Sequence, residues 1–137
     1  MEMFNGTWDL IDTLERTPEQ DRQMLAMACA SRQLWDDIGG PMELVTGDWL
    51  VAHVASKLGY EPLALDFAAA ANARAAVSDL PKWLAASTCE GLARAHAAAG
   101  HSEERDVWIE QAQQLLAEVD DDEDRALIES QIASIDR

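Results

Sequence analysis

Residues 52–59 read AHVASKLG and residues 93–100 read ARAHAAAG. Each stretch ends at a glycine, Gly59 or Gly100. Three positions around each glycine are compared: seven residues before it, five residues after it and twelve residues after it. Five of these six positions are alanine, namely Ala52, Ala64 and Ala71 around Gly59 and Ala93 and Ala112 around Gly100, and the sixth is Arg105. Small side chains let two helices cross closely, and glycine permits a tight turn between them. The pattern therefore predicts repeated pairs of packed helices.

Helix start and stop signals divide the chain into about seven helices. The strongest start is the capping box of Thr17 and Gln20, with Pro18 in the first turn, where its missing N–H is not needed. Thr7 and Ser102 are expected to cap two further helices. Gly39-Gly40-Pro41 is expected to end the second helix, since glycine takes the left-handed conformation and proline cannot continue the helix. Gly59 and Gly100 are expected to close two further helices.

We expect a single all-α domain, because no stretch alternates apolar and polar residues as a half-buried strand does. Its expected parts are an N-terminal helix pair over 6–39, repeat-like pairs over 43–78 and 80–119, and a capping helix over 121–136. The first helix is expected to carry Trp8, Ile11 and Leu14. The second is expected to bury a stripe of Met24, Ala28, Ser31, Trp35 and Ile38.

The composition favours close-packed helices and excludes several partners. Of the 137 residues, 24 are alanine, against 7 glycines and 4 prolines. The 26 Asp and Glu residues outnumber the 10 Lys and Arg residues, which gives a formal net charge of −16. Such a surface repels phosphate backbones and anionic membranes, so neither nucleic acid nor a membrane is an expected partner.

Cysteine usage and the N-terminal residues predict a cytoplasmic protein. Cys29 and Cys89 lack the spacing of a metal or redox motif, and we expect both to be free, buried thiols. The first residues lack the basic and apolar segments of an export signal. No apolar run approaches the roughly 20 residues of a membrane span.

Residues 90–100, EGLARAHAAAG, resemble a segment typical of tetratricopeptide-like proteins. More closely, the chain resembles a small family of actinobacterial proteins to which no activity is assigned. Further matching pieces, spread over about residues 20–135, are Ser31-Arg32, Trp35, Gly47-Asp48-Trp49-Leu50, Leu58-Gly59 and Asp122-Glu123-Asp124-Arg125. The resemblance implies a right-handed array of helical hairpins with one open, curved face. Members often carry histidine at the positions of Cys29 and Gln33, so a shared histidine-based site is not expected here.

The same resemblance implies where a partner would bind, because the first helix of each pair lines the concave face of tetratricopeptide folds. Counting back from the turn glycines gives ten groove positions: Thr46, Trp49, His53, Ser56, Lys57, Ser87, Glu90, Arg94, Ala97 and Ala98. Trp49 and His53 are four residues apart and share a helix face, and so do Glu90 and Arg94. With Lys57 they form the first candidate site. The competing interpretation is structural: a core tryptophan, a hydrogen-bonded histidine and an ordinary helix ion pair.

Arg32 and Trp35 form a second candidate site, beside the acidic residues Asp36 and Asp37. The competing interpretation is an amphipathic core helix in which Arg32 simply pairs with Asp36, four residues later.

Motifs for catalysis and metal binding are missing from the sequence. The three histidines lack ligand spacing, and Ser87 and Cys89 have no recognisable base arrangement. The acidic run over residues 118–124 has no glycine for the turn of a calcium loop and fits a helix N-terminus instead. We therefore expect no metal, no cofactor and no enzymatic activity.

These features predict a non-enzymatic adaptor that binds a protein or peptide, with a basic or amphipathic segment favoured by the acidic surface. One alternative is a small-ligand sensor or minor enzyme with a pocket near Trp49 and His53. Another is a homodimer. A deep, closed pocket would favour a small ligand, whereas an open groove with exposed apolar side chains would favour an adaptor.

Overall fold

The computed structural model of the chain describes residues 2–13 and 15–136. Over these residues it contains seven α-helices and no β-strand, which confirms the all-α prediction. The helices are α1 (Glu2–Ile11), α2 (Pro18–Ile38), α3 (Pro41–Leu58), α4 (Glu61–Val77), α5 (Lys82–Ala98), α6 (Ser102–Leu116) and α7 (Asp122–Ala133). Leu14, which was predicted to belong to the first helix, lies outside the described residues. No helix over 2–13 and 15–136 has the length and apolar content needed to cross a membrane.

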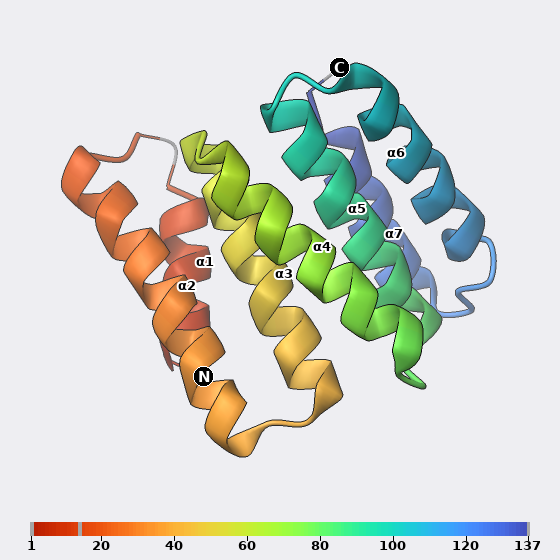
Figure 1. The fold of residues 1–137 in the computed structure, drawn as a ribbon, viewed down its shortest axis with the longest axis horizontal. Helices are drawn as coiled ribbons and strands as arrows, with labels where there is room; N and C mark the ends of the chain where they lie inside the picture. The colour runs from red at the N-terminus through yellow and green to blue at the C-terminus, as the bar shows by residue number, and fades with distance from the viewer. Residues whose placement is uncertain (1, 14, 137) are drawn as a thin grey trace.

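Each helix packs against the next along the chain. Figure 1 shows α2 in front of α1, α4 in front of α3, and α7 behind α5. Direct contacts also join α3 to α5 and α5 to α7. Trp8 of α1 packs against Trp49 of α3, with 5.8 Å between the ring centroids. The four odd-numbered helices therefore lie next to one another and share one face of the molecule.

Several helix boundaries form where the sequence predicted them. The Thr17 hydroxyl accepts a hydrogen bond from the Gln20 amide at 3.1 Å, and the Gln20 side chain accepts one from the Thr17 amide at 2.9 Å, which confirms the capping box. Gly59 and Gly100 follow α3 and α5 with φ angles of 74° and 78°, the left-handed conformation that favours glycine. Asp121 caps α7 by accepting a hydrogen bond from the Asp124 amide.

The predicted cap at Thr7 is wrong. α1 begins at Glu2, and Thr7 is a fully buried residue inside this helix. Gly6, the residue before it, has a packing role, because a Cβ at this position would collide with the end of the Met27 side chain of α2.

Two other predicted boundaries differ in detail. α6 begins at Ser102 itself, and His101 occupies the cap position without a side-chain hydrogen bond. Gly39 ends α2 with a φ of −96°, so it is not left-handed. Gly39 is required here because there is no room for a side chain. A Cβ at this position would lie 2.7 Å from the Trp35 carbonyl oxygen and 2.8 Å from Cβ of Glu43.

The core centres on α3, where Val45, Leu50 and Val51 are fully buried. The predicted stripe of α2 is buried at Met24, Ala28 and Ser31 but not at its end, since Ile38 is 82% exposed. The reason is length: α2 has 21 residues and α1 has 10, so α2 extends past the helix that covers it.

The two cysteines are both free, as predicted, but they differ in environment. Cys89 is buried in α5, whereas Cys29 lies exposed on α2, so the prediction that both are buried is wrong for Cys29. Cys29 directly follows the buried Ala28, and neighbouring positions of a helix point in different directions.

A buried carboxylate joins α2, α3 and α4. Asp48 of α3 is almost completely buried and accepts a hydrogen bond from Arg32 Nε of α2 at 2.5 Å. Its second oxygen lies 3.9 Å from Arg74 Nε of α4. Gly47, the residue before it, leaves the space that Arg32 fills, because a Cβ there would lie 2.7 Å from Arg32 Cδ.

We predict that Asp48→Ala lowers the free energy of unfolding by about 3 kcal/mol, because it leaves a poorly hydrated guanidinium without its main partner. The matched control is Asp36→Ala, which removes the exposed carboxylate 3.3 Å from the same arginine and should cost less than about 0.5 kcal/mol. Urea denaturation of both variants measures the difference. Equal losses in the two variants would contradict this assignment.

Candidate functional site

A largely apolar pocket of about 480 Å³ lies on the face shared by the odd-numbered helices. All four helices line it: Phe4 and Trp8 from α1, Thr46 and Trp49 from α3, Trp83, Leu84 and Ser87 from α5, and Asp124, Leu127, Ile128 and Gln131 from α7. Leu127 is 58% exposed, so this wall of the pocket meets solvent. Among the described residues that line the pocket, Asp124 alone carries a charge.

Packed aromatic rings form the wall between α1 and α3. The Trp8 and Trp49 rings each contact the His53 imidazole, with centroid distances of 5.6 Å and 5.2 Å. Phe4 extends the cluster through Trp8, 6.3 Å away, and through Trp35 of α2, 5.5 Å away. These pairwise contacts stabilise the wall beyond the burial of the rings alone.

The polar edge of Trp49 is used inside the protein. Its indole Nε1 donates a hydrogen bond to Glu90 Oε2 of α5 at 3.1 Å. The ring also packs on Gly91, where a Cβ would lie 3.0 Å from Trp49 Cδ1. Because Glu90 takes the only hydrogen-bond donor of the indole ring, Trp49 offers the pocket an apolar surface.

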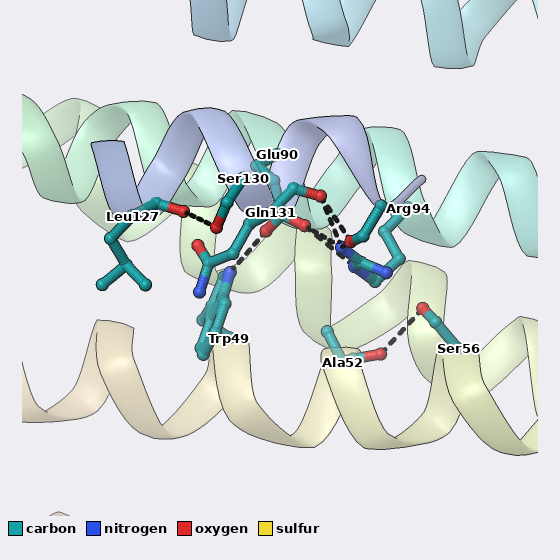
Figure 2. Close-up of polar contacts among 9 residues, drawn as sticks. Trp49, Ala52, Ser56, Glu90, Arg94, Leu127, Ser130 and Gln131 are labelled. Carbon is teal, nitrogen blue, oxygen red and sulfur yellow. Dashed lines mark hydrogen bonds and ion pairs between the residues drawn. The ribbon is translucent and has the colours of Figure 1, made fainter. Parts of the chain in front are cut away.

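Glu90 and Arg94 connect α3, α5 and α7 through a chain of hydrogen bonds (Figure 2). The Glu90 side chain has no exposed surface, and its Oε1 accepts a hydrogen bond from Arg94 Nε at 2.8 Å. Arg94 Nη2 then donates to the Gln131 carbonyl in the last turn of α7 at 2.9 Å, and to Oγ of Ser134, the residue after this helix, at 2.7 Å. A cation is favourable at a helix C-terminus, so Arg94 also satisfies the end of α7.

His53 is held in its neutral form. It is 5% exposed, and its Nδ1 has no hydrogen-bond partner among the described residues. Burial, together with the positive charges of Arg94 and Lys57, lowers the pKa of His53 to about 3. The imidazole therefore acts as a neutral ring packed under Trp8 and Trp49 at physiological pH.

A second, more polar pocket of about 380 Å³ lies further along the same face. Its lining residues are Ser56, Lys57, Arg94, Ala97, Ala98, Ser134, Ile135 and Asp136. Burial and the charges of Arg16 and Arg94 lower the pKa of Lys57, while Asp12 raises it. Early residues of α3, α5 and α7 line the apolar pocket, whereas later residues of α3 and α5 and the residues just after α7 line this pocket. The three helices therefore run in the same direction along the face.

The first candidate site is brought together only in part. Trp49 lines the apolar pocket, and Lys57 and Arg94 line the polar one. Glu90 and His53 lie beneath the surface and line neither of the two pockets. The Glu90–Arg94 pair is also more than an ordinary surface pair, since one partner is completely buried.

The second candidate site does not join the pocket. Arg32 is bound by Asp48 and Asp36. Trp35 packs on Phe4 and on the backbone around Gly47. In this structure both residues connect α2 to its neighbours.

The sequence pattern did not predict the contributions of α1 and α7 to the pocket, nor that of Trp83 of α5. Phe4, Trp8 and Leu127 belong to helices without a turn glycine from which a groove register could be counted. Trp83 lies one helical turn before Ser87, a predicted groove position, so extending that count by four residues would have found it.

No family model, curated protein or solved structure matches this chain.

We predict that His53 makes folding sensitive to mild acid. Its pKa is about 3 in the folded state, against 6.5 for a free histidine side chain. The unfolded chain therefore binds the proton more readily, and stability that is complete above pH 6.5 is lost as the pH falls toward 3. From pH 7.5 to pH 5 the loss due to His53 should be about 2 kcal/mol.

Chemical denaturation of the wild type and of His53→Gln and His53→Phe at these two pH values tests this. Both variants should lose about 2 kcal/mol less than the wild type over this interval. The same pH dependence in all three proteins would show that His53 is not the group responsible.

Proposed function

We propose that the protein is a cytoplasmic, non-enzymatic adaptor that binds a segment of another protein on the face formed by α1, α3, α5 and α7. One observation carries this proposal: the aromatic pocket of about 480 Å³ that draws its lining from all four helices. The exposed Leu127 makes part of its apolar wall accessible to a partner. Aromatic side chains around a concave site are typical of surfaces that anchor the side chains of a partner protein.

We further propose that the helices pair as in tetratricopeptide-like arrays, with α7 as a cap. The left-handed turns at Gly59 and Gly100 support this pairing. So does the complete burial of the small residues at the predicted crossings: Ala52, Ala64, Ala93 and Ala112. In such arrays the first helix of each pair lines the binding face, which agrees with a pocket on the odd-numbered helices.

The state of two reactive side chains of α5, Cys89 and Glu90, supports binding rather than chemistry. Burial raises the pKa of the Cys89 thiol to about 11, so little nucleophilic thiolate is present at neutral pH. Glu90 is fully buried and bonded to Trp49 and Arg94. Free cysteines are also compatible with a reducing compartment.

The second candidate function is a small-ligand sensor that uses the same pocket. The volume favours it, since about 480 Å³ lies within the range of roughly 300–1,000 Å³ typical of small-molecule sites. The exposed rim at Leu127 and the contribution of four separate helices favour a polypeptide.

We predict that filling the pocket abolishes peptide binding without unfolding the protein. Ser87→Trp places a large ring in the pocket, whereas Val107→Trp adds the same ring to the exposed surface of α6 and serves as the control. A library of displayed random peptides selected on the wild type should yield peptides that bind Val107→Trp normally. They should bind Ser87→Trp at least about tenfold more weakly, a loss of about 1.4 kcal/mol.

The adaptor proposal fails if no selected peptide distinguishes Ser87→Trp from Val107→Trp. A different outcome is that a small apolar molecule, such as a naphthalene-based fluorescent dye, binds the wild type but not Ser87→Trp, while no peptide depends on the pocket. In that case the small-ligand function replaces the adaptor function. Circular dichroism of both variants checks that each keeps its helices.

A further inference from the structure

We infer that the segment bound in the aromatic pocket is an amphipathic helix whose apolar stripe is flanked by basic side chains. This inference rests on the proposed function and adds the conformation and charge of the partner. Three features of the described residues support it: the scarcity of polar groups in the pocket, the position of Asp124, and the charge of the whole chain.

The lining of the pocket favours a helix over an extended peptide. An extended segment brings unpaired N–H and C=O groups, which must find partners when they are buried. Apart from the indole N–H groups of Trp8, Trp49 and Trp83, the polar side chains at the pocket are limited to Thr46, Ser87, Gln131 and Asp124. The Trp49 N–H, which could have served an extended backbone, is taken by Glu90. A helix bonds its own backbone internally and needs to present only apolar side chains.

The charge at the rim favours a basic partner. Asp124 lines the pocket, and it follows Asp122 and Glu123 in the first turn of α7. The adjacent cation, Arg125, is engaged by the Val119 carbonyl and lies 3.5 Å from Asp122. The start of α7 therefore presents an excess of carboxylates beside an apolar wall.

The spacing along α7 sets where the partner's cation lies. Asp124 precedes the rim residue Leu127 by three positions, which is a rise of about 4.5 Å along the helix. A lysine or arginine about one turn from the apolar anchor of a bound helix has a side chain long enough to reach Asp124. We therefore expect the pocket and Asp124 to recognise an apolar side chain and a cation that lie about one helical turn apart on the bound helix.

The charge of the chain disfavours a second copy as the occupant. Each chain has a formal net charge of −16, so two copies repel one another as they approach. A basic helix is attracted by the same field, and its binding should weaken as salt is added.

A pair of substitutions at Leu127 tests the charge of the partner. Leu127→Glu and Leu127→Lys remove the same exposed apolar side chain and add opposite charges at the rim. The probes are peptides selected from the random library on the wild type. We expect them to be helical when bound and rich in Lys or Arg, and to bind Leu127→Glu about tenfold more tightly than Leu127→Lys at low salt. Asp124→Asn should weaken binding, whereas Glu110→Gln on α6 should not.

The outcomes separate this inference from the proposed function. Selected peptides that are acidic, uncharged or proline-rich but lost in Ser87→Trp would overturn the basic helix and leave the adaptor function standing. Equal binding to Leu127→Glu and Leu127→Lys would likewise overturn it. If no selected peptide depends on the pocket, both fail. Formation of a stable dimer that Ser87→Trp dissociates would replace the basic helix by a second copy of the chain.

Discussion

The arrangement of the inner face depends on one buried carboxylate, that of Glu90. It lies in the middle of α5 with no exposed surface and accepts hydrogen bonds from Trp49 of α3 and Arg94 of its own helix. A buried carboxylate is tolerated only when such partners replace its water. Arg94 also binds the Gln131 carbonyl in the last turn of α7. Through Trp49 and Arg94, the Glu90 carboxylate therefore connects α3, α5 and α7, three of the four helices that line the pocket.

The apolar character of the pocket follows from this polar network beneath it. Trp49 uses its N–H on Glu90 and shows the pocket only carbon surface, while burial and nearby cations keep His53 neutral. The charged groups lie at the rim and in the second pocket, where Asp124 and Lys57 are found. A largely apolar, aromatic pocket on a strongly acidic chain is the basis of the proposed adaptor function.

Local signals in the sequence were sufficient to predict the helices but not the full site. Gly59 and Gly100 marked the turns, and their register placed Trp49 on the face that carries the aromatic pocket. Phe4 and Leu127 could not be found in this way, because they reach the pocket through tertiary packing of helices far apart in sequence. The exposure of Ile38 has a similar origin, since helical periodicity does not reveal where a covering helix ends.

A double-mutant cycle on Glu90 and Arg94 measures how strongly this buried pair holds the inner helices together. Urea denaturation of Glu90→Ala, Arg94→Ala and the double variant gives the three free energies of unfolding. Each single change should cost about 3–5 kcal/mol, because each leaves a buried charge unpaired, and the double change should cost little more than either alone. Single changes below about 1 kcal/mol, or costs that simply add, would show that the buried pair does not hold the inner helices together.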